Sequence, residues 1–192
     1  MFHDGNRALQ KWAGSTDLAD RLVEKNNRTQ FSDEDKPFIE SVSFFFIASA
    51  SPDGQPDCSF KGGAPGFVQI SSPNQLVFPD YDGNGMFKTL GNIRSHPQVG
   101  LLFIDLTASP KRLRVNGRAS VELGPPKNHD LPGAQALVTV TAEQIFPNCP
   151  RYIPDLSRGE ESKYIPQKGV PPVEPAWKEF EAFKDVVPPR RV

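Results

Sequence analysis

The sequence has few residues of the kinds that build disulfide frameworks and metal centres, with 2 cysteines and 3 histidines among 192 residues. Cys58 and Cys149 stand far apart, with no C-x-x-C spacing, so neither a disulfide framework nor a zinc site is indicated. The three histidines, His3, His96 and His129, are too scattered for metal-ligand spacing. We therefore expect a chain with reduced thiols and no bound metal.

Long apolar runs and an excess of one charge are also missing. The longest apolar run, Phe44 to Ala48, is far shorter than the roughly 20 residues that cross a bilayer, and residues 1–15 lack a secretory apolar stretch. Lys plus Arg is 22 and Asp plus Glu is 23, which leaves no field to attract nucleic acid or anionic lipid. We expect a soluble cytoplasmic protein that binds neither nucleic acid nor membrane.

Proline and phenylalanine are plentiful, at 20 and 14 residues. The prolines concentrate in residues 147–192, whereas the phenylalanines indicate a substantial core elsewhere. We divide the chain into an N-terminal helical arm (1–40), a central domain (41–147) and a Pro-rich C-terminal arm with a short helix (148–192). That late helix would begin at Pro175 and carry an aromatic stripe of Trp177, Phe180 and Phe183.

Capping residues and apolar spacing predict three helices in the first arm. They would begin at Asp4, at Thr16 or Asp17, and at Ser32. The first would carry Leu9 and Trp12, and we expect the arm to cover part of a core.

Short apolar segments separated by turn residues follow, and they favour a closed antiparallel sheet over β-α-β units. The segments are 44–48, 66–70, 76–78, 99–104, 113–123 and 137–146. A helix over residues 87–94 interrupts them and ends before His96 and Pro97.

Asn116-Gly117 is a typical hairpin turn, yet the alternation of apolar residues continues through it. We therefore predict one continuous strand, with a bulge or a close approach at Gly117. Its other face carries Arg112, Arg114 and Arg118, for which a solvated edge is favoured over an anion site.

Two loop patterns bear on ligands. Asp80 to Gly85 matches the first positions of a calcium-binding loop, but Lys88 and Gly91 stand where oxygen ligands are required, so no calcium site is predicted. A phosphate site at the start of the 87–94 helix is as well supported as a plain solvated helix start. Its residues would be Ser59 and Lys61, beside glycines such as Gly62, together with Asn84, Gly85, Lys88 and Thr89.

Four segments in order, 46–63, 76–93, 96–105 and 112–119, resemble the pyridoxamine 5′-phosphate oxidase-like flavoproteins. The resemblance implies a mainly β (α+β) fold, a six-stranded-type antiparallel split β-barrel with peripheral helices, which binds FMN at a homodimer interface. The vitamin B6 enzyme usually has arginine where Ser59 stands, and its C-terminal substrate pattern is not visible after Arg151. A related flavoprotein of the same family is therefore expected.

The resemblance also assigns residues. It places Ser59 and Lys61, with Lys88 and Thr89, at the FMN phosphate. Asn84 and Gly62 lie beside these, and Arg112 and Arg114 approach the flavin ring.

The function that the resemblance implies is an FMN-dependent oxidoreductase acting on a small molecule, for which the sequence offers no dedicated acid or base. A deazaflavin-dependent reductase, a non-catalytic flavin- or haem-binding module and a purely structural dimer stay open as alternatives.

Overall fold

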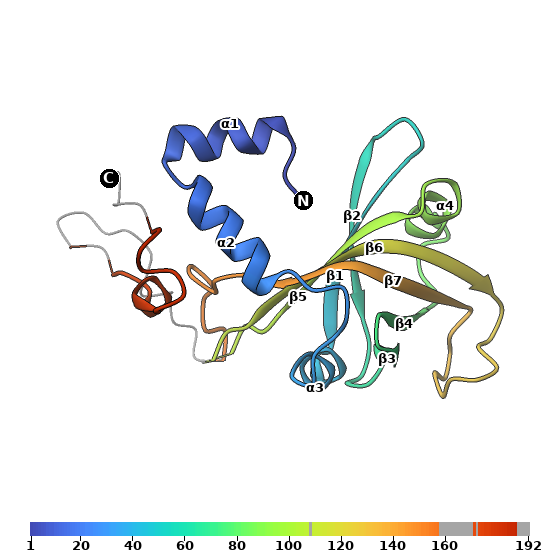
Figure 1. Ribbon diagram of the computed structural model, residues 1–192. Coiled ribbons are helices and arrows are strands. Elements are labelled where there is room, and N and C mark those ends of the chain that lie inside the picture. Colours follow the sequence, from blue (N-terminus) through green and yellow to red (C-terminus); the bar gives the residue numbers. More distant parts are fainter. Residues whose placement is uncertain (108, 158–170, 172, 188–192) are drawn as a thin grey trace.

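The computed structural model describes residues 1–107, 109–157, 171 and 173–187 of the chain. An antiparallel sheet of seven strands forms the centre, and helices surround it (Figure 1). The strands are β1 (Phe44–Ala50), β2 (Pro56–Gly62), β3 (Gln69–Ser72), β4 (Gln75–Asp80), β5 (Gln98–Ile104), β6 (Arg112–Leu123) and β7 (Ala136–Pro147). The helices are α1 (Asp4–Ala13), α2 (Thr16–Asn26), α3 (Asp35–Ser41), α4 (Lys88–Ser95) and the 3₁₀ helix η1 (Ala176–Glu179). None of these helices is long and apolar enough to cross a membrane.

The sheet curls around one aromatic-rich core, with strand order β2-β1-β5-β6-β7-β4-β3. Phe45 of β1 lies 5.0 Å, ring to ring, from Phe78 of β4 and 5.1 Å from Phe103 of β5. Strands at opposite ends of the order therefore face each other across the core. Because β2 and β3 do not pair among the described strands, the sheet stays split, and the closed sheet expected from the turn pattern is wrong. The mainly β split-barrel class is confirmed, with seven strands rather than six.

The continuous strand predicted across Asn116-Gly117 is confirmed, because β6 runs unbroken from Arg112 to Leu123. The pairing of β6 with β7 shifts register between Asn116 and Gly117. A Cβ added at Gly117 would lie 2.1 Å from the backbone oxygen of Thr141, so β7 leaves no room for a side chain there. Glycine is required at this bulge by the close approach of the neighbouring strand.

The first two helices exist, but their caps differ from those expected. His3 precedes α1, and its ring Nδ1 accepts the backbone N–H of Gly5 at 3.1 Å, so His3 and not Asp4 is the cap. Ser15 precedes α2 and makes no side-chain cap bond. Neither helix contains a buried residue, and Leu9 and Trp12 are exposed. The expected cover over the core therefore does not come from α1 or α2, and the part of the arm that packs on the core is α3, through Ile39.

The third helix begins at Asp35 rather than at Ser32. The Asp35 carboxylate accepts the Ser32 N–H at 2.8 Å and pairs with Arg28, so these residues form a turn ahead of α3. Arg28 in turn exchanges two backbone hydrogen bonds with Ile145 of β7. This Arg28–Asp35 clamp fixes α3 against the sheet, where Ile39 is fully buried.

The segment after β7 contains less helix than its aromatic spacing predicts. Among the described residues after β7, only Ala176–Glu179 is helical, because Phe180 returns to an extended conformation with ψ of 135°. Trp177 and Phe183 still contact, with ring centroids 6.2 Å apart and nearly perpendicular planes. Residues 158–170, 172 and 188–192 of the predicted C-terminal arm lie outside the described part of the chain.

Candidate functional site

A cavity of about 490 Å³ opens between β2, the end of β4 and the start of α4. Six of the eight predicted site residues line it together: Ser59, Lys61, Gly62, Asn84, Lys88 and Thr89. They come from stretches of chain separated by two strands, and the curl of the sheet brings them together.

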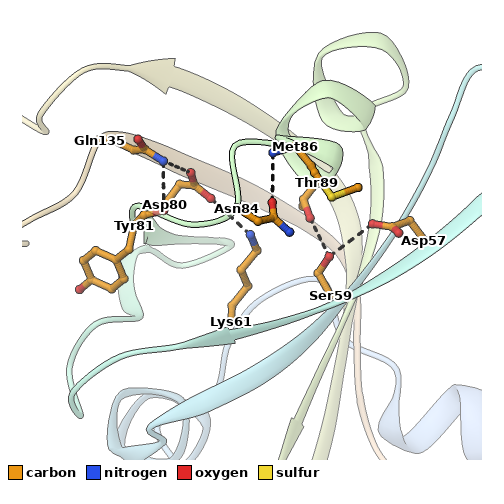
Figure 2. A network of polar contacts seen from close by, with 9 residues as sticks. All are labelled: Asp57, Ser59, Lys61, Asp80, Tyr81, Asn84, Met86, Thr89 and Gln135. Carbon is orange, nitrogen blue, oxygen red and sulfur yellow. Dashed lines mark hydrogen bonds and ion pairs between the residues drawn. The ribbon is translucent and has the colours of Figure 1, made fainter.

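Residues of β2 alternate between its two faces, so Asp57, Ser59 and Lys61 all point toward the cavity side. The Thr89 hydroxyl, at the start of α4, donates to the Ser59 Oγ at 2.9 Å. The Ser59 hydroxyl donates to an Asp57 oxygen at 3.3 Å, as Figure 2 shows. Lys88 Nζ lies 3.3 Å from the other Asp57 oxygen, so one carboxylate holds both a hydroxyl and an ammonium group.

Lys61 reaches across the split in the barrel. Its Nζ lies 3.3 Å from Asp80 Oδ1, at the last residue of β4. The Gln135 side chain donates to the second Asp80 oxygen at 3.0 Å, as drawn in Figure 2. Asp80 is only 7% exposed, so Lys61 balances its charge and the Gln135 amide replaces water as a hydrogen-bond donor.

The loop between β4 and α4 determines the backbone conformation at the first residues of α4. The Asn84 side-chain oxygen accepts the Met86 N–H at 3.0 Å (Figure 2). Phe87 then adopts a left-handed conformation, with φ of 48°, and gives α4 no side-chain cap. The first backbone N–H groups of α4 therefore have neither a helical partner nor a side-chain cap. Phe87 to Leu90 line the cavity, so these groups are available at its wall.

Sequence reasoning missed the acidic half of this cavity. Asp57, Asp80 and Asp82 line it beside the two lysines. The position of Asp57 could have been found, because it lies two residues before Ser59 on one strand face. Gln135 carries no comparable signal, since its place depends on the loop between β6 and β7 returning to Asp80.

Arg112 and Arg114, predicted to approach the same ligand, lie elsewhere in the described chain. Arg112 donates from Nη2 to the backbone oxygen of Cys149 at 2.7 Å. Burial, and then the charge of Arg114, lower the pKa of the Arg112 guanidinium. Arg114 lines a second cavity, beside Phe146. The structure does not bring these two arginines to the first cavity.

Metal ligands are not gathered at either cavity. Within the described ranges, the structure contains no group of three or more His, Cys, Asp or Glu side chains that could hold a metal ion.

Residues 31–170 match the pyridoxamine 5′-phosphate oxidase family, a span of well over half of the chain. The chain belongs to this family. No curated protein sequence matches it.

Solved structures with related folds are distant in sequence. HupZ from Group A Streptococcus is 14% identical, with a TM-score of 0.47, covering 69% of this chain and 99% of that one. An FMN-binding protein from Syntrophomonas wolfei is 11% identical, with a TM-score of 0.45, covering 74% and 95%. A FAD-binding protein from Mesorhizobium loti is 15% identical, with a TM-score of 0.42, covering 62% and 94%.

Proposed function

We propose that the protein binds FMN, with the phosphate group in the cavity at the start of α4. The observation that carries this proposal is the convergence of Lys61 and Lys88 with the hydroxyls of Ser59 and Thr89 around one cavity. Two ammonium groups, two hydroxyls and the uncapped start of a helix are the donors that a phosphate monoester needs. Membership of the family supports a flavin as the molecule that carries the phosphate.

The acidic side chains do not contradict this assignment. Each lysine holds a carboxylate oxygen at 3.3 Å, so each ammonium group already contacts an anion beside the cavity. A phosphate would compete with Asp57 for Lys88 and with Asp80 for Lys61. The residues fit a phosphate, and the two aspartates reduce its affinity.

We further propose that the protein works as an oxidoreductase on a small molecule and as a homodimer. The flavin, when bound, supplies two-electron chemistry, and the chain binds and orients it. A partly exposed aromatic group on the outer sheet face supports the dimer. Phe60, 62% exposed, stacks on Phe44 with centroids 5.5 Å apart, and Phe46 contacts both rings.

The visible absorbance of the purified protein tests the proposal, followed by addition of FMN if the protein is colourless. A flavin spectrum, with extracted FMN identified by mass, is the expected result. Reduction of the bound flavin by a nicotinamide cofactor would support the oxidoreductase role. If the extracted cofactor is a deazaflavin, the protein is a deazaflavin-dependent reductase instead. If FMN is bound but no reductant reduces it, the protein is a non-catalytic flavin-binding module. A colourless protein that does not bind added FMN would overturn the proposal.

A further inference from the structure

A second cavity, of about 820 Å³, lies where Arg114 and Phe146 face α2 and the segment around η1. In Figure 1, α2 and the segment around η1 lie on the same side of the sheet, away from α4. The two cavities share no described lining residue. This volume is within the usual range for small-molecule sites.

Aromatic rings form much of the wall of this second cavity. Phe146 comes from β7, and Trp177 and Phe183 meet edge to face in the segment after it. Large rings of this kind favour a planar, aromatic ligand, which can stack or pack edge-on against them.

Among the described residues, the second cavity is lined by a positive charge alone, whereas the first is lined by charges of both signs. Arg114 is exposed, and the described lining residues include no Asp or Glu. A guanidinium without an acidic neighbour is well suited to bind a carboxylate through two parallel hydrogen bonds. Two residue pairs along the β6–β7 ladder, the amides of Asn116 and Gln144 are 3.4 Å apart and add neutral polar groups on the same face as Arg114.

Several buried polar atoms around the cavity have no hydrogen-bond partner among the described residues. They are Asn27 Oδ1, Asn148 Oδ1 and the Trp177 indole Nε1, all on residues that line it. A buried donor without a hydrogen bond costs free energy, and the Trp177 indole N–H is a donor that a carboxylate oxygen could accept from. The two amide oxygens are acceptors, so a carboxylate would leave them unpaired. Arg112 supports the same wall, since it holds the Cys149 carbonyl.

We propose that this second cavity binds a planar aromatic carboxylate, with the ring against Phe146 and Trp177 and the carboxylate on Arg114. The site goes beyond the flavin proposal and does not depend on it, because it uses none of the residues assigned to the phosphate. The protein would then have one site for the flavin phosphate and a separate site for an aromatic acid.

Titration of the full chain with 2-naphthoate tests the proposal through tryptophan fluorescence. The chain has 2 tryptophans, so Trp12→Phe leaves Trp177, in the cavity wall, as the reporter. We expect saturable quenching in this background and an affinity at least tenfold lower in Arg114→Met. Arg118→Met, on the same strand but outside the cavity, is the matched control and should bind as the parent does.

The uncharged analogue 2-naphthamide separates charge recognition from apolar binding. We expect it to bind more weakly than 2-naphthoate to the parent and equally to the parent and Arg114→Met. Arg114→Lys keeps the charge but loses the two parallel hydrogen bonds, so its affinity should fall between those of the parent and Arg114→Met. Arg114→Gln, which is also uncharged, replaces Arg114→Met if that variant does not fold. Absence of saturable quenching, or equal binding of the two probes, would overturn the proposal.

Competition distinguishes this site from the flavin site. If FMN displaces 2-naphthoate, the cavity holds the flavin ring itself and the separate site is wrong. FMN binding is measured independently through flavin fluorescence, so failure of the flavin proposal leaves the naphthoate result standing.

Discussion

The two lysines of the first cavity differ in how far solvent reaches them, and this difference bears on how each would bind an anion. Lys88 is more than half exposed, whereas Lys61 is largely enclosed, at 57% and 20% side-chain exposure. Solvent therefore screens the Lys88–Asp57 pair more than the Lys61–Asp80 pair. The two lysines are not equivalent, and we expect the proposed phosphate to displace Asp57 from Lys88 more easily than Asp80 from Lys61.

Replacing Lys88 by alanine should weaken FMN binding by about tenfold, near the low end for a charge-assisted hydrogen bond (roughly 1.5 kcal/mol). Arg94→Ala, in the same helix but outside the cavity, is the control and should leave the affinity unchanged. Fluorescence titration with FMN measures both variants. Unchanged affinity in Lys88→Ala would remove Lys88 from the phosphate site.

Replacing Asp57 by asparagine should have the opposite effect. It frees Lys88 and removes a negative charge from the cavity wall, so FMN affinity should rise severalfold, and the gain should shrink in high salt. Asp53→Asn, in the turn between β1 and β2, changes the net charge equally without touching the cavity. Equal gains in both variants would show that only overall charge matters.

The bulge in β6 is the element with the least tolerance for change. Gly117→Ala would place a methyl group 2.1 Å from the Thr141 oxygen, and both strands are too well paired to move freely. We expect a loss of at least about 2 kcal/mol in the free energy of unfolding. Ser120→Ala, exposed on the same strand, should change it little, and urea denaturation of both variants gives the comparison.

The Arg28–Asp35 clamp at the start of α3 makes the free energy of unfolding depend on pH in the acid range. Burial acts to raise the pKa of Asp35, but hydrogen bonds from Arg28 and Ser32 outweigh it, and the pKa is lowered. Because the folded-state pKa lies below the unfolded value of about 3.9, this contribution is present above pH 4 and disappears as pH falls through the folded value.

Asp35→Asn should therefore lower the free energy of unfolding by about 2 kcal/mol at neutral pH. Below about pH 4, the free energy of unfolding should fall less steeply with decreasing pH in the variant than in the parent. Denaturant unfolding of the parent and the variant between pH 2 and 7 measures both effects. Asp33→Asn, in the same turn but exposed, is the control. Parallel acid limbs in parent and Asp35→Asn would contradict the role assigned to Asp35.

At the level of the whole molecule, the homodimer is the proposal with the widest consequences. If the flavin site spans two chains, dilution that separates the dimer should release FMN over the same concentration range. Sedimentation velocity and flavin fluorescence on one dilution series provide the test. Retention of FMN by a demonstrated monomer would place the whole site within one chain.

Sequence patterns predicted the parts of this molecule that depend on local alternation and spacing. The strand through Gly117 and the helix near Lys88 followed from such patterns. The patterns and the family resemblance also singled out six residues that line one cavity, whereas their role at a phosphate stays a prediction. The split in the sheet followed from the family resemblance alone. The Lys61–Asp80 pair and the second cavity were not predicted, because each depends on residues brought together by long-range folding. The predicted starts of the first and third helices were wrong because His3 and Asp35 make side-chain contacts that residue preferences do not encode.

The Lys61–Asp80 pair has a consequence for motion as well as for affinity. It ties edge strand β2 to β4 across the split, where no backbone ladder joins them in the described chain. An anion that draws Lys61 away loosens this tie, while its own contacts to β2 and α4 replace it. Amide hydrogen exchange along β2 would therefore report ligand occupancy directly, with protection rising as the cavity fills.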